Sequence, residues 1–302
     1  MPESAPAAAT GPHVAGRDLA LLVAMNVIWG LNLVASKIGV GEFPPIFFTA
    51  LRFAMLAVVL LPLLRRHHGE MTTLLTAALL TGPATFALLF LGIARVEHVS
   101  NVAIASQLGV PFSTLLSVWL LGERIHWRRT LGIILAFAGV VVIGLDPRMF
   151  ASRAGLLLVA ASAFVGALGV VYIKKLRTVR PLQLQAWISV AGGLLLLPLS
   201  LSVESGQWAA VQSATWHGWG ALAYTAVMAS LIGHSTWYYL VGRYPVTGLA
   251  PITLLTPLFG IVFGVTLLGD QLTTRVIIGG SITLVGVYIV IRRERRLVDT
   301  GT

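Results

Sequence analysis

Long apolar stretches alternate with short polar or charged segments from residue 18 to residue 292. Val99–Leu121 and Val276–Ile291, for example, contain no charged side chain. A helix that crosses a bilayer needs about 20 mostly apolar residues, and its backbone hydrogen bonds are satisfied within the helix itself. The pattern therefore predicts an all-α membrane protein with ten transmembrane helices, at residues 18–40, 46–64, 73–94, 99–121, 128–145, 154–174, 183–203, 216–241, 247–268 and 276–292.

The composition favours the same class, because 57% of the 302 residues are hydrophobic and only 11% are charged. A soluble chain of this length has no way to bury so many uncharged helices around one core. Residues 1–16 are rich in Ala, Pro and Gly, and we expect them to be disordered rather than to form a secretory signal. The longest loop, 204–215, is too short for a domain. Function is therefore expected within the membrane or in short turns.

The net charge of +10 is a signal of topology. If the N-terminus is cytoplasmic, most of the 21 Lys and Arg residues fall in cytoplasmic segments, and the opposite side holds only Arg95, Arg148, Arg153 and Arg275. Cytoplasmic loops carry such an excess, so both termini are predicted to be cytoplasmic. No basic soluble domain is present to bind nucleic acid. The sequence has no cysteine, and we expect neither a metal site nor a cofactor.

The second half of the chain repeats the first. Leu120–Glu123 recurs as Leu267–Asp270, a shift of 147, and a shift of 136 relates earlier positions such as Pro45 and Pro181. Five spans in each copy is an odd number, so the two copies are predicted to have opposite orientations in the membrane, with a binding site between them. The predicted units are a cytoplasmic N-terminus, two five-helix repeats and a cytoplasmic tail, at residues 1–16, 17–146, 147–293 and 294–302.

Short motifs along the chain resemble those of the drug/metabolite transporter superfamily, in its ten-helix EamA-type branch. They are Trp29-Gly30-Leu31-Asn32 with Lys37, Leu51-Arg52-Phe53, Pro111, Leu120-Leu121-Gly122-Glu123-Arg124, and Tyr238-Tyr239 with Pro257 and Gly269-Asp270. Asp270-Gln271 departs from the family's usual Glu-Arg pair. The chain looks most like the bacterial amino-acid and metabolite exporters of the YddG type. The resemblance implies a central cavity, alternating access and export of small metabolites across the inner membrane.

Charged groups inside the spans are few, and each is a functional candidate because burial in a membrane is costly. Lys37 and Arg52 can bind a substrate carboxylate, or they can reach the outer interface and bond helix-end carbonyls. The structural role is favoured for Arg52, and both readings stay open for Lys37. His234 is a candidate proton carrier, although a buried hydrogen-bonding role is commoner. No Asp or Glu lies in the core of a span, which leaves ion coupling undetermined and weakens a multidrug reading.

Neutral polar and aromatic side chains complete the candidate cavity. Amides can bind a zwitterion or join helices, and aromatic groups can wall a cavity or lie at the membrane interface. Prolines inside spans kink helices: a static bend is favoured for Pro83 and a gating hinge for Pro257, with Pro111 a third kink. Besides Lys37, the substrate-binding candidates are Asn32, Phe90, Asn101, Gln107, Phe164, Trp187, Trp237 and Tyr238.

The leading hypothesis is a secondary transporter that exports amino acids, including aromatic or bulky apolar ones, and related small metabolites. A sugar-phosphate or nucleotide-sugar exchanger is the runner-up, but it needs more basic groups than Lys37 and Arg52, and multidrug efflux is a further alternative. No catalytic or phosphate-binding motif is present, so we expect neither an enzyme nor an ATP-driven pump. The expected partners are a small-molecule substrate and the lipid bilayer, with no nucleic acid, and the protein is expected to be a monomer.

Overall fold

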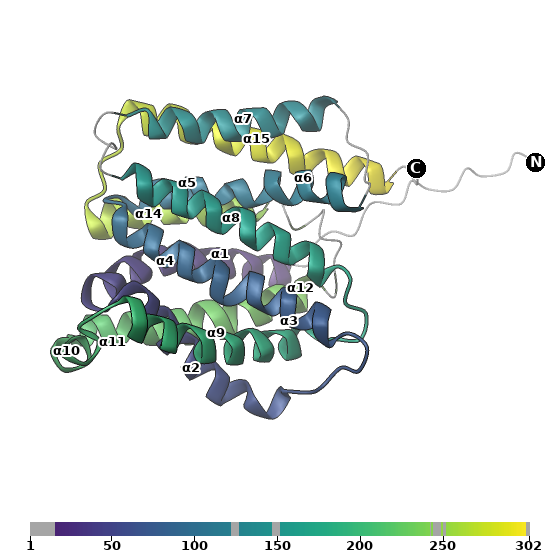
Figure 1. Ribbon diagram of the computed structural model, residues 1–302. Helices are drawn as coiled ribbons and strands as arrows, with labels where there is room; N and C mark the ends of the chain where they lie inside the picture. Colours follow the sequence, from purple (N-terminus) through teal and green to yellow (C-terminus); the bar gives the residue numbers. More distant parts are fainter. Residues whose placement is uncertain are drawn as a thin grey trace, which may run out of the picture.

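The computed structural model describes residues 16–121, 127–146, 152–241 and 252–299, together with Arg243 and Leu249. Within these residues the chain forms helices joined by short turns, and it contains no strand. Most of the helices run roughly side by side in one bundle (Figure 1). The all-α class predicted from the apolar pattern is therefore confirmed for the described part of the chain.

Continuous helices follow most of the apolar stretches. Proline begins two of them, because Pro45 and Pro181 occupy the first helical position, where no backbone N–H bond is lost. The segment 204–215, predicted as a loop, instead contains the short helix α10 (Gln207–Ser213). The continuous helices are α1 (Gly16–Glu42), α2 (Pro45–Leu60, extended by a 3-10 turn at Leu61–Leu63), α7 (Trp127–Gly144), α8 (Arg153–Ile173), α9 (Pro181–Val203), α14 (Leu255–Leu268) and α15 (Thr274–Asp299).

The remaining apolar stretches are interrupted near their middle. Two of them contain a π-helical segment and two contain or begin with a 3-10 turn. The π-helical segments are η2 (Leu80–Ala84), between α3 (Met71–Leu79) and α4 (Thr85–Arg95), and η5 (Tyr224–Gly233), between α11 (Trp216–Ala223) and α12 (His234–Val241). The 3-10 turns are η3 (Ser106–Leu108), between α5 (Val99–Ala105) and α6 (Gly109–Leu121), and η6 (Ile252–Leu254), directly before α14.

These interruptions recur at the same offset as the sequence repeat. The shift of 147 carries η2 onto residues 227–231, inside η5, and carries η3 onto residues 253–255, which overlap η6. Proline explains the two 3-10 turns, because Pro111 and Pro257 lack the N–H that would bond four residues earlier. Those earlier residues, Gln107 and Thr253, lie in η3 and η6. Corresponding helices are thus broken at corresponding positions.

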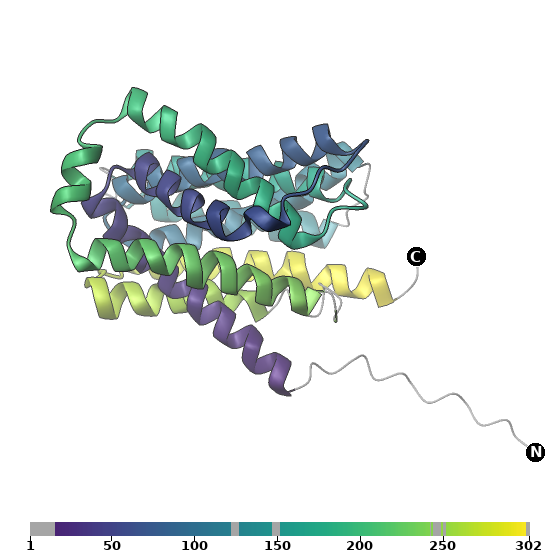
Figure 2. The same ribbon diagram turned by 90° about the horizontal axis from the view of Figure 1, so that it is seen from below.

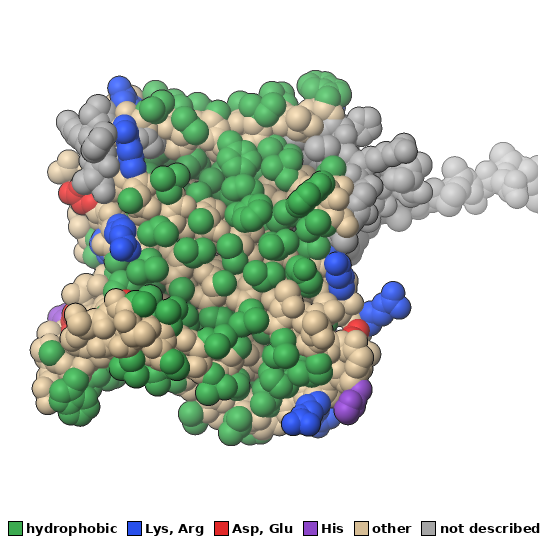
Figure 3. All heavy atoms as spheres, viewed as in Figure 1, with side chains coloured by type: hydrophobic (Ala, Val, Ile, Leu, Met, Phe, Trp, Pro, Cys, Tyr) green, Lys and Arg blue, Asp and Glu red, His purple; other side chains and the backbone are tan. Residues whose placement is uncertain are grey.

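The surface of the bundle suits a lipid environment. Six helical segments are long and apolar enough to cross a membrane, and the shorter apolar helices Thr130–Ile143, Ile252–Leu268 and Thr274–Val290 add to them. Hydrophobic side chains cover the middle of the face in Figure 3, and Lys and Arg side chains gather towards its two ends. Val58 and Leu194 are 77% and 69% exposed, which is favourable only next to lipid or a partner. The chain is a multi-pass membrane protein.

Two ends of the bundle can be distinguished. α1 begins and α15 ends at the same end (Figure 2), which we call the terminal end. The opposite end, where α1 finishes and α5 and α8 begin, we call the far end. Successive apolar stretches, rather than the individual helices within them, run alternately between the two ends (Figure 1).

Glycines set the spacing of the tightest helix pairs. α7 packs along α15, α2 along α9, and α1 along α14. A Cβ added to Gly139 would lie 2.4 Å from the carbonyl oxygen of Gly279, and one added to Gly279 would lie 2.5 Å from the carbonyl oxygen of Gly139. On α1, a Cβ at Gly30 would lie 2.5 Å from the Cβ of Phe259. Small residues of this kind let helix backbones approach closely in membranes.

Candidate functional site

A cavity of about 390 Å³ lies inside the bundle between helices from both halves of the chain. Its walls are mainly aromatic and aliphatic, and a few polar side chains enter it, as is typical of small-molecule sites. Both π-helical regions border it, through Thr81 of η2 and through His234, the first residue after η5. The lining residues are Trp29, Arg52, Phe53, Thr81, Phe86, Val170, Ile173, Leu184, Gln185, Ile188, His234 and Trp237.

Arg52 is the charged residue of this lining, and it is only 2% exposed. Its Nε and Nη2 atoms donate to the Ser230 hydroxyl at 3.0 and 2.6 Å. Its Nη1 atom is buried and has no hydrogen-bond partner among the described residues. The guanidinium carbon lies 4.5 Å from the ring centroid of Phe86 and 5.7 Å from that of Phe90. Arg52 therefore neither reaches the membrane interface nor bonds a helix-end carbonyl, the roles that the sequence favoured for it.

The π-helical segment η5 contains Ser230, which bonds Arg52, and it leads directly into His234, which lines the cavity. In a π-helical stretch the backbone bonds span five residues instead of four, and side-chain donors also bond the carbonyls of η5. Ser230 Oγ donates to Thr225 O at 2.8 Å, and Trp29 Nε1 donates to Ala229 O at 3.1 Å. His234 Nδ1 lies 3.2 and 3.1 Å from the carbonyl oxygens of Ala229 and Ser230. Because both are acceptors, Nδ1 carries a proton and donates, which favours the structural role for His234.

The other π-helical segment, η2, is held by threonines in a similar way. Thr85 Oγ1 donates to Leu80 O at 2.5 Å, and Thr81 Oγ1 donates to Ala77 O at 2.7 Å. Gly82 has non-helical backbone angles, φ −103° and ψ −106°, directly before Pro83. Pro83 therefore lies in a real kink, and it packs in a buried position. π-Helical segments occur often at functional sites, and here η2 contributes Thr81 to the cavity lining and η5 leads directly into the lining residue His234.

A second pocket, of about 440 Å³, lies at the terminal end. Leu63, after α2, and Pro181, at the start of α9, line it together with Ser235 and Tyr239 of α12. Two exposed arginines, Arg65 and Arg180, also belong to this lining. Since α12 contributes His234 and Trp237 to the central cavity, the two pockets share one wall.

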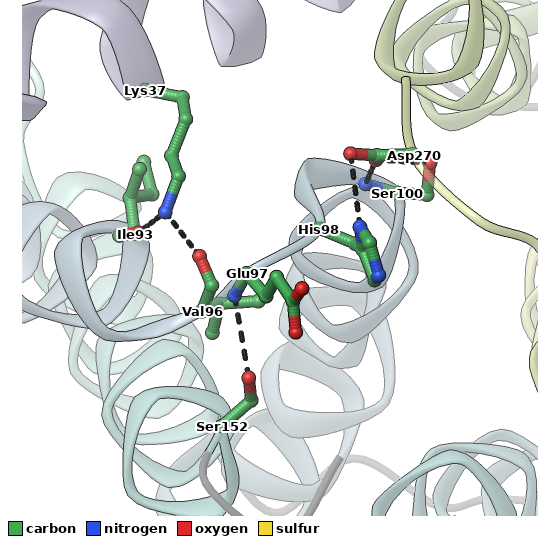
Figure 4. A network of polar contacts seen from close by, with 8 residues as sticks. All are labelled: Lys37, Ile93, Val96, Glu97, His98, Ser100, Ser152 and Asp270. Atoms are coloured by element: carbon green, nitrogen blue, oxygen red, sulfur yellow. Dashed lines mark hydrogen bonds and ion pairs between the residues drawn. The ribbon is translucent and has the colours of Figure 1, made fainter. Parts of the chain in front are cut away.

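Polar contacts tie the helices together at the far end (Figure 4). Lys37 Nζ donates to the carbonyl oxygen of Ile93 at 3.1 Å and to that of Val96, at the end of α4. The backbone N–H of Glu97 donates to Ser152 Oγ at 3.3 Å. Lys37 therefore satisfies helix-end carbonyls, one of its two predicted roles, and it is absent from the lining of the central cavity.

Asp270 lies on the other side of this far-end network. Its Oδ2 accepts bonds from the Ser100 N–H at 2.7 Å and from Ser100 Oγ at 2.6 Å, at the start of α5. Its Oδ1 lies 3.4 Å from His98 Nδ1. Asp270 thus joins the end of α14 to the start of α5, and it serves this role without an arginine at position 271.

Among the predicted aromatic candidates, only Trp237 lines the central cavity among the described side chains. Trp187 donates its Nε1 to Arg65 O at 2.9 Å near the terminal end and is not part of the lining. Phe164 is 41% exposed and packs edge-on against Phe112 at 5.3 Å. Phe90 is fully buried behind Arg52. The side chain of Tyr238 lies outside the described residues.

The amide and proline candidates also fall outside the lining. Asn101 is buried next to Ser100 in α5, and Gln107 lies in the 3-10 turn η3. The side-chain oxygen of Asn32 is buried without a hydrogen-bond partner among the described residues. Pro111 and Pro257 each lie three residues into a helix that follows a 3-10 turn. Sequence reasoning missed Thr81 and the link between Arg52 and Ser230, because no local pattern announces a contact 178 residues apart.

Comparison with known proteins identifies relatives over nearly the whole chain. The sequence model of the EamA-like transporter family matches residues 18–145 and 153–292. A "probable amino-acid metabolite efflux pump" of Escherichia coli K12 is 30% identical, covering 94% of this chain and 98% of the relative. A protein of the same description from Salmonella typhimurium is 31% identical, covering 90% and 93%.

A solved structure, described only as a crystal structure of a protein, shares the fold with a TM-score of 0.66. It is 19% identical, and the match covers 93% of this chain and 98% of that chain. At this identity the likeness concerns the fold alone.

Proposed function

This chain belongs to the EamA-like transporter family, and on that premise we propose that it is a secondary transporter that exports amino acids and related small metabolites by alternating access. The family and the efflux-pump relatives indicate a transporter rather than an enzyme. One observation carries the proposal. The central cavity lies between the two halves of the chain, at the positions where corresponding helices are broken. Transporter sites are built in this way at the interface of two repeats.

We infer that ten spans form two five-helix repeats of opposite orientation. In a two-fold arrangement, the contacts of one helix recur for its counterpart in the other half. α8 contacts α3, η2 and α4, and α1 contacts their counterparts α11, η5 and α12. Likewise, α1 contacts α14, and α8 contacts α6.

Two polar links support the same symmetry at opposite ends of the bundle. At the far end the carboxylate of Glu42 accepts bonds from the N–H and hydroxyl of Thr215, at 2.6 and 2.7 Å. At the terminal end the carboxylate of Glu70 accepts bonds from the N–H and hydroxyl of Thr178, at 3.1 and 2.6 Å. The shift of 136 carries position 42 to position 178, so the acid of the first link corresponds to the threonine of the second. The shift of 147 carries position 70 to position 217, two residues after Thr215.

We propose that the protein lies in the inner membrane and that its terminal end faces the cytoplasm. The charge distribution supports it, because the basic residues gather on that side. In this orientation the Lys37 and Asp270 network closes the periplasmic side, and the pocket with Arg65 and Arg180 faces the cytoplasm. In an exporter, the transport cycle begins from such an inward-facing state. All residues of the proposed site come from one chain, so a monomer is sufficient to form it.

The lining of the cavity favours amino acids with aromatic or bulky apolar side chains. Trp29, Phe53 and Phe86 provide apolar walls, and Gln185 adds a neutral polar group. A phosphate-bearing substrate needs several basic groups, and Arg52 is the basic one among the described lining residues. A cationic drug needs a carboxylate, and this described lining contains none. Both alternatives are therefore disfavoured.

Counterflow in proteoliposomes tests the proposed function. Purified protein is reconstituted into vesicles loaded with unlabelled L-phenylalanine or L-leucine, and entry of the labelled amino acid is followed against protein-free vesicles. We expect saturable accumulation that disappears when the vesicles are not preloaded. If the folded protein gives no counterflow for any amino acid of a complete panel, the proposed function is wrong.

A further inference from the structure

We propose that Arg52 binds the carboxylate of the transported molecule, so that the protein accepts carboxylate-bearing solutes and rejects the corresponding amines. The inference rests on the proposed transport function, but it concerns recognition and is measured by binding alone. It arises from an unpartnered guanidinium nitrogen on a buried side chain that lines the central cavity.

The hydrogen-bond inventory of Arg52 leaves one edge of the guanidinium open. The group has five N–H donors and no acceptor. Ser230 Oγ accepts from Nε and Nη2, and its own proton goes to Thr225 O. Nη1 donates to none of the described residues. The edge formed by Nη1 and Nη2 is therefore the one on which a carboxylate binds with two parallel hydrogen bonds.

The charge inventory leads to the same conclusion. None of the described Asp and Glu residues forms an ion pair with Arg52, which is only 2% exposed. The faces of Phe86 and Phe90 stabilise the cation in part. A buried charge without a counter-ion remains strongly unfavourable. A substrate carboxylate supplies the missing negative charge, and an ammonium group would instead add repulsion.

Two arginines extend this preference towards the terminal end. Arg65 and Arg180 line the second pocket, which shares α12 with the central cavity. Positive charge at the mouth of a low-dielectric pocket raises the local concentration of anionic groups. Within the cavity, the ring centroids of Trp29 and Trp237 lie 6.4 Å apart, beside the position where an aromatic substrate side chain would pack. Phenyl-bearing probes are therefore suitable ligands.

Four related probes separate the carboxylate from the rest of the ligand. Phenylacetate carries only the carboxylate, 2-phenylethylamine only the amine, L-phenylalanine both, and L-phenylalaninamide an amine with a neutral amide. Binding to the purified full-length protein in detergent is measured by calorimetry. We expect phenylacetate and L-phenylalanine to bind, and the other two probes to bind at least about tenfold more weakly.

Variants of Arg52 identify the group responsible. Arg52→Gln is expected to weaken phenylacetate binding by about 10- to 100-fold, the effect of losing charged hydrogen bonds. Arg52→Lys keeps the positive charge but loses the two parallel N–H donors of the guanidinium group, and it should weaken binding by about tenfold. Arg95→Gln is the matched control, because Arg95 is exposed and bonds Leu91 O outside the cavity. Thermal unfolding confirms that each variant is folded before binding is measured.

The possible outcomes separate this inference from the proposed function. Equal binding of phenylacetate and 2-phenylethylamine, no binding of phenylacetate by the wild type, or unchanged binding in both folded Arg52 variants would overturn it. If phenylacetate binds as expected but no amino acid shows counterflow, the carboxylate site stands and the proposed export function fails. If L-phenylalanine is transported and Arg52→Gln transports it equally well, the export function stands and the carboxylate site fails.

Discussion

At the scale of single residues, the chemistry of the cavity depends on side chains that also hold η5 in place. Ser230 bonds both Thr225 O and Arg52, and His234 bonds carbonyls of the π-helical segment. A buried carbonyl left without a donor costs about 1–3 kcal/mol. The same side chains thus contribute to stability and place the open edge of Arg52.

His234 gives a prediction about proton coupling. Because its Nδ1 donates to Ala229 O and Ser230 O, we expect His234→Gln, whose amide can still donate, to keep both counterflow and any response to a pH gradient. His234→Leu, which has no donor, should lower the free energy of unfolding by about 1–3 kcal/mol. Uptake driven by a pH gradient is measured beside counterflow in the same vesicles. Loss of the pH response alone in His234→Gln would show that the histidine carries the proton.

Some site residues were predictable from the sequence and some were not. His234 stood out because a membrane span rarely contains a titratable group, and Trp237 stood out as a large aromatic side chain about one turn from the end of the predicted span 216–241. The role of Arg52 depends on Ser230, which is brought to it only by the fold. Trp187 was predicted at the cavity from its depth along the helix, which does not say which face a side chain occupies. In the structure its Nε1 bonds Arg65 O near the terminal end.

At the scale of helices, stability depends on glycines at close crossings. Gly139→Ala places a methyl group within 2.4 Å of Gly279 O, so α7 and α15 must move apart. We expect a loss of about 1–3 kcal/mol in the free energy of unfolding, the range for overpacking. Gly220→Ala in α11 is the matched control, because nothing lies within 4 Å of its added Cβ. Equal stability of the two variants in thermal unfolding would contradict this packing.

A second prediction at this scale concerns how stability depends on pH through Glu70. This residue directly precedes α3 and bonds Thr178 in the connection between α8 and α9. Hydrogen bonds from the Thr178 hydroxyl, and then from the N–H groups of Arg177 and Thr178, lower the pKa of Glu70. A lowered pKa in the folded state means that Glu70 stabilises the protein fully above its unfolded pKa of about 4.3. This contribution is lost as the pH falls below that value through the folded pKa.

Glu70→Gln removes this contribution. Thermal unfolding of the wild type and of Glu70→Gln is compared between pH 7 and pH 3. We expect the wild type to be the more stable protein at pH 7 and the difference to shrink below about pH 4.3. A difference that stays constant down to pH 3 would show that the ionised form of Glu70 does not stabilise the link to Thr178.

The helices themselves follow from the apolar pattern, whereas their internal breaks follow from it only in part. Apolar stretches predict helices because a membrane leaves the backbone no other partner. Pro111 and Pro257 predict breaks in their helices, and 3-10 turns are present directly before α6 and α14. The π-helical segment η5 has no such signal, since its donor Trp29 comes from 200 residues away. The helix α10 was missed because it is only 7 residues long.

At the scale of the whole molecule, both halves of the chain build one cavity, and we propose that each side of the membrane reaches it in turn. In the proposed mechanism, the far-end contacts of Lys37 and Asp270 close one side, and the pocket near Arg65 lies on the open side. Alternating access requires these contacts to break when the terminal end closes. The natural absence of cysteine makes this exchange measurable with single introduced thiols.

The most direct test is therefore the accessibility of Thr81→Cys, in the cavity lining, to a membrane-impermeant thiol reagent. It is applied to right-side-out and to inside-out vesicles, with Ser202→Cys, exposed near the far end, as the control. We expect Thr81→Cys to be labelled from both sides, more slowly when L-phenylalanine is present, and Ser202→Cys to be labelled from the outside only. Labelling of Thr81→Cys from one side alone, unchanged by any amino acid, would contradict alternating access through this cavity.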